Sequence, residues 1–231
     1  MTYILVHGLG HGGWCWERTK KELESRGHDV IAPDQPLTSL GNDADTVARL
    51  IETHSPAIVV GHSYGGLVIS YAAGRTRGTI SKLVYLAAAM IGADDDYLAL
   101  VAEYDTPLSA DLIDNDGTWL TVRPDKAARA FYNECDEETA QAAIAQLRPT
   151  SVNCHAITEP LPEPWQEIDT LYIVCAKDQA MPPGAQRILA NKAARVAEID
   201  TDHSPFLSAT RALCDLLVAW DSGEIGLAAG A

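Results

Sequence analysis

The chain has 231 residues, 47% of them hydrophobic, and its 32 acidic and 17 basic residues give a formal net charge of -15. This length can bury the core of one domain, while the acidic balance disfavours nucleic-acid partners and anionic membrane surfaces. The sequence shows no secretory leader, no membrane-spanning run and no paired motif among its five cysteines, so we expect a reduced, cytoplasmic location.

Short apolar runs alternate with segments of helical spacing along most of the chain. The runs predict strands at residues 3–6, 29–32, 57–60, 82–86, 171–174 and 197–199. Apolar residues at three-to-four spacing predict helices at residues 17–26, 44–53, 64–75, 184–194 and 205–220. This alternation predicts an α/β fold: a mostly parallel six-stranded sheet with helices on both faces.

The alternation stops between residues 91 and 167. That segment offers short helical pieces and a proline-rich exit, and no strand is expected in it. We predict a small helical cap over the carboxyl ends of the strands, inserted into a core formed by residues 1–90 and 168–231. The alternative is a solvated insertion without a role in function.

The stretch IVVGHSYGG at residues 58–66 carries the most informative pattern of the chain. A buried strand that runs into Gly-x-Ser-x-Gly is typical of a nucleophile elbow, a sharp turn between a strand and a helix. Gly61 and Gly65 suit this turn because glycine lets strand and helix approach closely. The pattern predicts Ser63 as the nucleophile, with the His62 side chain turned away; the alternative is a glycine-rich turn with an idle serine.

A serine nucleophile needs a histidine base, and the base needs an acid that fixes its tautomer. In folds with this elbow, the acid and then the histidine follow the serine along the chain. Asp178 lies just beyond the predicted strand at residues 171–174 and His203 beyond the last predicted strand, at the sheet edge where Ser63 is expected. The rival acids Asp200 and Asp202 precede His203 in the same segment and are expected to reach its far ring nitrogen poorly.

The first strand ends in the glycine-dense loop VHGLGHGGW. We expect the backbone N–H groups of Leu9 and of Tyr64, the residue after the serine, to form an oxyanion hole. A phosphate-binding loop fits poorly, because neither Gly-x-Gly-x-x-Gly nor a Lys-Ser/Thr pair is present. His7 and His11 are four residues apart but lie in a loop without a glutamate base, so no metal site is expected.

With these motifs in place, the chain resembles the α/β-hydrolase superfamily over nearly its whole length. The strings VHGLGHGGWCW, GHSYGG, AFYNEC, LRPT, YIVCAKDQAMPP and DHSPFLS resemble the branch that holds plant methylesterases, hydroxynitrile lyases and small bacterial esterases. The resemblance implies a cofactor-free site, a helical cap and often a homodimer. Hydroxynitrile lyases of this branch resemble one another in a threonine and a lysine where this chain has Gly8 and Ser204, which favours ester hydrolysis.

The sequence therefore predicts a serine hydrolase that cleaves carboxylic esters of small neutral substrates through an acyl-enzyme. Carbamate or amide hydrolysis on the same three residues is one alternative, and a non-catalytic small-molecule receptor is another. Hydroxynitrile lyase activity is the least favoured. The residues expected to contact the substrate are Gly8, His11, Trp119, Phe131 and Phe206.

Overall fold

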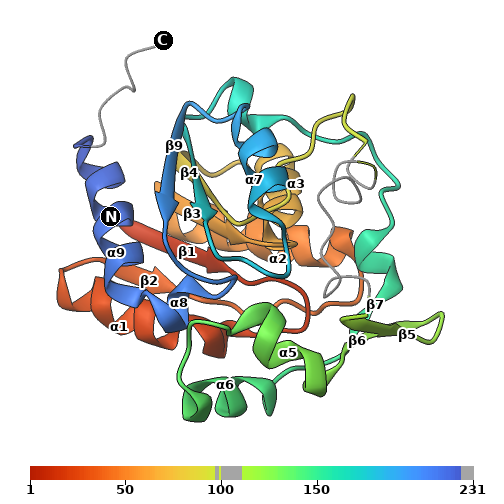
Figure 1. The fold of residues 1–231 in the computed structure, drawn as a ribbon. Coiled ribbons are helices and arrows are strands. Elements are labelled where there is room, and N and C mark those ends of the chain that lie inside the picture. Colours follow the sequence, from red (N-terminus) through yellow and green to blue (C-terminus); the bar gives the residue numbers. More distant parts are fainter. Residues whose placement is uncertain (97–98, 100–110, 225–231) are drawn as a thin grey trace.

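The computed structural model describes residues 1–96, 99 and 111–224 and shows one central sheet (Figure 1). Its strands, in spatial order, are β2 (Asp29–Ile31), β1 (Thr2–Val6), β3 (Ala57–His62), β4 (Ile80–Leu86), β8 (Thr170–Cys175) and β9 (Arg195–Ile199). Every neighbouring pair is parallel. The predicted α/β fold with a six-stranded sheet is confirmed.

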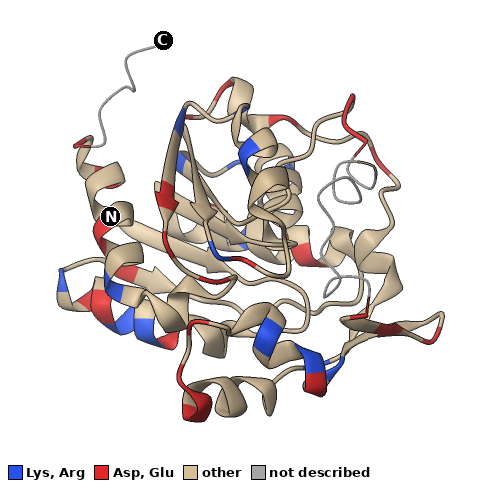
Figure 2. Ribbon diagram, in the orientation of Figure 1, with Lys and Arg blue, Asp and Glu red and all other residues tan. Residues whose placement is uncertain are grey.

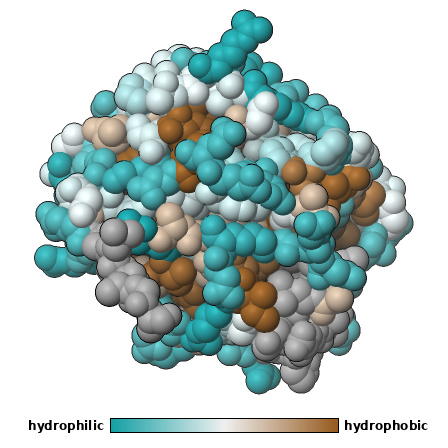
Figure 3. Space-filling view, turned by 90° about the horizontal axis from the view of Figure 1, so that it is seen from above, coloured by the Kyte–Doolittle hydropathy of each residue, from teal (hydrophilic) through white to brown (hydrophobic). Residues whose placement is uncertain are grey.

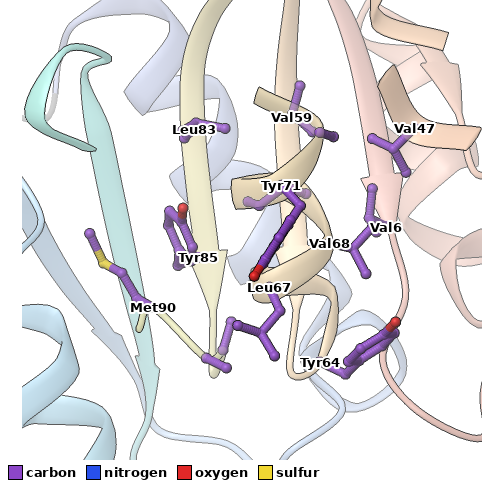
Figure 4. Close-up of a cluster of buried hydrophobic side chains, with 14 of the residues drawn as sticks. Val6, Val47, Val59, Tyr64, Leu67, Val68, Tyr71, Leu83, Tyr85 and Met90 are labelled. Atoms are coloured by element: carbon purple, nitrogen blue, oxygen red, sulfur yellow. The ribbon is translucent and has the colours of Figure 1, made fainter. Parts of the chain in front are cut away.

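Helices cover both faces of this sheet (Figure 1). One face packs against α2 (Leu40–His54), α3 (Gly65–Arg75) and α7 (Pro183–Ala190), and the other against α1 (Glu17–Ser25) and α9 (Thr210–Ser222). Alternation along β3 explains the two layers, because Val59 lies in the first hydrophobic cluster while Ile58 and Val60 lie in the second. Figure 4 shows part of the first cluster, where Val6 and Val59 lie with Val68 of α3.

The single helix predicted over residues 205–220 is two helices, α8 (Pro205–Ser208) and α9. Ala209 separates them with φ of -138° and ψ of 38°, outside the helical region. The Ser208 hydroxyl, in the last position of α8, donates to the Asp202 carboxylate at 2.6 Å. This bond holds the short first helix against the loop that follows β9, in an orientation that α9 does not continue.

The insertion contains strands as well as helices, so the expectation of no strand there is wrong. Antiparallel strands β5 (Ile113–Asn115), β6 (Trp119–Val122) and β7 (Thr150–Ser151) accompany α5 (Pro124–Phe131), α6 (Glu137–Ile144) and the 3-10 helices η2 (Val152–His155) and η3 (Pro164–Gln166). The missed signal is the Asp116-Gly117 turn, where Gly117 has φ of 89° and Asp116 accepts the N–H of Trp119. The division into core and cap stays a prediction.

Charged side chains gather on outer helices and loops, and Figure 2 shows both signs together on α1. The face seen in Figure 3 is largely hydrophilic, with hydrophobic residues in separate patches. In the part of the chain that is described, no helix has both the length and the apolar character to cross a bilayer. All five cysteines are free thiols.

Candidate active site

Ser63 lies in the turn between β3 and α3 with φ of 54°, a left-handed conformation that few residues other than glycine adopt. Its N–H donates to the Leu86 carbonyl at 3.2 Å, and its own carbonyl accepts the N–H groups of Gly66 and Ala89 at 3.0 and 3.1 Å. Such a conformation persists only where the surroundings hold it on several sides, and it is frequent at functional positions. The predicted strand-turn-helix context of Ser63 is present.

The glycines around this turn have no room for a side chain. A Cβ on Gly61 would lie 2.5 Å from the Gly65 carbonyl oxygen, and one on Gly65 would lie 2.7 Å from the Val6 carbonyl oxygen. The steric requirement expected from the Gly-x-Ser-x-Gly pattern is therefore present, because the helix backbone passes directly over two strands.

Asp178 and His203 meet at the ends of the adjacent strands β8 and β9. Nδ1 of His203 lies 2.6 Å from Oδ2 of Asp178, and both side chains are almost fully buried. Oδ1 of the carboxylate accepts the N–H groups of Ala180 and Met181 at 2.8 Å each, and Oδ2 also accepts Nε2 of Gln186 at 2.8 Å. A carboxylate fixed in this way keeps the proton on Nδ1 and leaves Nε2 as the acceptor nitrogen.

The rival carboxylates have other partners. Asp202 accepts the backbone N–H groups of Ser204 and Glu134 at 3.0 and 2.9 Å. Asp200 pairs with Lys177 at 3.0 Å, with 78% of its side chain exposed. Neither is joined to the His203 ring by a hydrogen bond of the described residues, as the sequence order suggests.

The His203 ring packs against two aromatic side chains. His62 lies 4.6 Å away between ring centroids, and its Nε2–H donates to the His203 backbone carbonyl at 2.8 Å. Phe131, from the end of α5, stacks on His203 at 5.3 Å with the planes 26° apart. The expectation that His62 turns away from the site is wrong, because the loop after β9 folds back over the side of β3 where its ring lies.

Ser63 and His203 both line a cavity of about 120 Å³. Among the described residues no hydrogen bond joins the two side chains, and in hydrolases such bonds often form fully only when substrate is bound. The wall of the cavity also includes Leu9 from the loop after β1, His62 at the end of β3 and Phe131 from the insertion. The cavity thus lies between the carboxyl edge of the sheet and the inserted segment.

The five residues expected to contact a substrate have different positions. His11 and Phe131 line the cavity. Gly8 lies so close to the elbow that a Cβ added to it would be 2.9 Å from the serine Cβ. Phe206 is fully buried in the second hydrophobic cluster, and Trp119 on β6 is 41% exposed; neither lines the cavity. The cavity residues that sequence reasoning missed are Leu112, Ile113, Val122, Ala180 and Met181.

The loop after β1, which leads into the 3-10 helix η1 (Gly13–Trp16), is held from the insertion. The Tyr132 hydroxyl donates to Nε2 of His11 at 2.9 Å, and Nδ1–H of His11 donates to the Leu9 carbonyl at 2.9 Å. Nε of Arg148 adds a bond of 2.8 Å to the His11 carbonyl. Within the described residues neither Leu9 nor Tyr64 donates its backbone N–H to another group, so both can serve a ligand oxygen.

The chain matches a family model across most of its length. A model described as "Alpha/beta hydrolase family" covers residues 3–216. The chain belongs to this family. The sheet order, the serine elbow and the paired Asp178 and His203 agree with the assignment.

This α/β hydrolase has relatives of similar length. It is 32% identical to "Norfluorocurarine synthase 2" of Strychnos sp, over 94% of this chain and 93% of that protein. It is 29% identical to "Methylesterase 7" of Arabidopsis thaliana, over 94% of each chain. Its fold matches the crystal structure of polyneuridine aldehyde esterase with a TM-score of 0.84 at 22% identity, covering 95% of this chain and 98% of that one. The resemblance to the methylesterase branch is confirmed.

The loop histidines of this α/β hydrolase are neutral hydrogen-bonding groups. Burial lowers the pKa of His7 to about 4 and that of His11 to about 3. Both ring nitrogens of each are engaged; for His7, Nδ1–H donates to the Gly8 carbonyl at 2.9 Å and Nε2 accepts the Gln35 N–H at 3.1 Å. In the described ranges no group of three His, Cys, Asp or Glu is arranged to hold a metal ion.

Acid pH is expected to destabilise the hydrolase through these two histidines. In the unfolded chain an imidazole takes up a proton below about pH 6.5, whereas buried His7 and His11 stay neutral down to about pH 4 and 3, so acid favours unfolding. Between pH 7 and pH 5 each histidine should lower the free energy of unfolding by about 2 kcal/mol. Urea unfolding at the two pH values measures this loss.

The His7→Asn variant isolates one contribution, since its amide can still donate to the Gly8 carbonyl. The variant is expected to be less stable at pH 7, but its loss between pH 7 and pH 5 should be smaller than that of the unmodified protein by about 2 kcal/mol. As an internal control, the free energy of unfolding should change by the same amount in the two proteins between pH 8 and pH 7. If both proteins lost the same free energy of unfolding between pH 7 and pH 5, His7 would not contribute to the acid destabilisation.

Proposed function

We propose that this chain hydrolyses carboxylic esters of small neutral substrates through an acyl-enzyme. The observation that carries the proposal is the 2.6 Å contact between His203 and Asp178 at a cavity that Ser63 also lines. A serine hydroxyl becomes nucleophilic when an imidazole takes its proton, and the imidazole needs a carboxylate to fix its tautomer. Similarity to a protein named as a methylesterase supports the same class of reaction.

The proposed cycle has two acyl transfers. Oγ of Ser63 attacks the ester carbonyl while Nε2 of His203 accepts the hydroxyl proton, and the imidazolium then gives this proton to the alcohol oxygen as the C–O bond breaks. Water attacks the acyl-serine with His203 again as base, and Ser63 recovers its proton as the acid leaves. Asp178 stays ionised and stabilises the imidazolium in both halves.

Backbone N–H groups stabilise the oxyanion of each tetrahedral intermediate in this proposal. Leu9 supplies one N–H from the loop after β1, and Tyr64, the residue after the serine, supplies the other. The loss of one such donor typically raises the barrier by about 3 kcal/mol. Carbamates and amides would follow the same cycle with a different leaving group.

Lyase chemistry has less support at these positions. Ser204 offers no cation beside His203 for a departing cyanide. A Cβ at Gly8 would lie 2.9 Å from the Ser63 Cβ and 3.2 Å from Nδ1 of His62, so a threonine there would require the elbow to shift. Both features favour hydrolysis.

Turnover and covalent labelling together test the proposal. The protein is expected to hydrolyse p-nitrophenyl butyrate and to carry a fluorophosphonate label on Ser63, located by mass spectrometry of the digested protein. Binding of an ester without turnover or label would instead favour a non-catalytic receptor. A p-nitrophenyl carbamate and an anilide of the same acyl size rank the alternative leaving groups.

The cavity is expected to discriminate against charged esters. No Lys, Arg, Asp or Glu is among its described lining residues, and the chain as a whole is acidic. Because an unpaired carboxylate is costly to desolvate, kcat/KM for mono-p-nitrophenyl succinate should be roughly 100-fold below that for p-nitrophenyl butyrate. The methyl ester of the same succinate is the matched neutral control and should recover most of the rate. Equal rates for the acid and its methyl ester would contradict an uncharged site.

We also expect a homodimer located in the reduced cytoplasm. Analytical ultracentrifugation at micromolar concentration tests the first expectation. Fractionation of the source cells, with an antibody to the chain, tests the second.

A further inference from the structure

Asp43 is a buried carboxylate on α2 that lies outside the cavity. Its side chain is fully buried, and no ion pair of the described residues includes it. Oδ1 accepts the Leu37 N–H at 2.8 Å, Oδ2 accepts the Tyr64 hydroxyl at 2.8 Å, and the Cys154 thiol lies 3.7 Å from Oδ2. Burial raises the pKa of this carboxyl group although its hydrogen bonds and the Arg148 charge oppose the effect, so its position without a directly paired cation is unfavourable.

The contacts converge on backbone of unusual conformation. Tyr64 follows Ser63, whose φ is 54°, and Leu37 itself also has φ of 54°. Neither residue is a glycine, so both conformations depend on outside contacts. The Asp43 carboxylate therefore anchors both the Tyr64 side chain, next to the serine elbow, and the N–H of Leu37.

Tyr64 connects Asp43 to the cavity. Its ring is 4% exposed and belongs to the first hydrophobic cluster, at one end of the residues drawn in Figure 4. Its backbone N–H is the oxyanion donor in the function proposed above. An anchor at the far end of the ring restricts rotation of the Tyr64 peptide about the elbow, and with it the direction of that N–H.

We propose that Asp43 is a positioning residue for ester hydrolysis, acting through the Tyr64 hydroxyl to aim the Tyr64 N–H at the substrate oxyanion. This inference rests on the proposed function. An oxyanion donor is effective only when its direction is set before the reaction, since a displaced donor loses strength where charge develops. The bond between Asp43 and Tyr64 provides that constraint from outside the cavity, where a substrate does not disturb it.

Tyr64→Phe is the sharpest test, because it keeps the ring and the backbone N–H and removes only the hydroxyl. We expect kcat for p-nitrophenyl butyrate to fall about tenfold with KM unchanged, and the affinity for a trifluoromethyl ketone to fall by the same factor. Asp43→Leu, which cannot bond the Tyr64 hydroxyl, should act in the same way. The double variant should be no worse than the more impaired single variant, because both changes break one contact.

Tyr71→Phe, on helix α3 that follows Tyr64, is the matched control. Tyr71 is also buried, and its hydroxyl makes one bond of 2.8 Å, to the Glu159 carbonyl. Its loss should lower the melting temperature without changing kcat or the affinity for the ketone. A role of Asp43 in stability alone predicts that Tyr64→Phe behaves like Tyr71→Phe, and that result overturns the proposal.

The remaining outcomes are also decisive. A rise in KM with kcat unchanged in Tyr64→Phe would place the bond in substrate binding and overturn the inference. Fluorophosphonate labelling of the unmodified protein separates this result from failure of the proposed function, in which neither label nor turnover appears. If Asp43→Leu does not fold, Tyr64→Phe alone decides.

Discussion

Replacement of Ser63 by alanine is expected to lower kcat for p-nitrophenyl butyrate by roughly 10⁴- to 10⁶-fold, because the acyl-enzyme can no longer form. The fold should remain, since the backbone bonds of this residue to Leu86 and Ala89 do not involve the hydroxyl. The residual rate would come from direct attack of water on the bound ester, with the oxyanion donors still stabilising the charge that develops on its carbonyl oxygen. Steady-state kinetics and thermal unfolding of the same preparations measure both quantities.

Ser70→Ala is the matched control for this prediction. Ser70 is another buried serine, on α3, and its hydroxyl is bonded to the Gly66 carbonyl at 2.9 Å and to the Tyr85 hydroxyl at 2.7 Å. Its loss should reduce stability and leave kcat within about twofold. Full activity of Ser63→Ala would rule out Ser63 as the nucleophile, whatever the result for Ser70→Ala.

The contact of Asp178 with His203, and the position of Ser63 and His203 at one cavity, could be predicted because each residue has a local signal. Ser63 directly follows β3, Asp178 and His203 lie in the loops after β8 and β9, and parallel strands bring their carboxyl ends to one edge of a sheet. A crossover between parallel strands has one handedness, so the order along the chain limits which loops become neighbours. Strand ends therefore carry information about contacts that are distant in sequence.

The cavity walls could not be predicted in the same way. Ile113 and Val122 reach the cavity from strands that are too short and exposed to show an alternating pattern, and β5 is exposed along its whole length. His62 was misplaced because strand alternation gives the direction of a side chain but not which loop folds back to meet it. Asp43 has no signal in sequence at all, since its partner Tyr64 is identified only when α2 packs beside α3.

Replacement of Asp178 by asparagine is expected to lower kcat roughly 10⁴-fold while Ser63 and His203 both remain. The amide oxygen will take the place of Oδ1, where the two N–H groups of Ala180 and Met181 require an acceptor. The amide NH₂ then faces Nδ1 of His203, so the imidazole must accept there and carry its proton on Nε2. In that tautomer the ring cannot take a proton from the serine.

Nε2 of Gln186 makes this tautomer argument testable, because it also donates to the position that the new NH₂ would occupy. The clash of two donors should lower the melting temperature of Asp178→Asn in addition to its effect on kcat, because Gln186 Nε2 is held in place by the Met181 carbonyl at 2.7 Å. Asp200→Asn is the control for charge alone, because Asp200 is exposed and, among the residues that the structure describes, pairs only with Lys177. If Asp200→Asn lost activity as severely as Asp178→Asn, the acid would be misassigned and the 2.6 Å contact would have to be a structural one.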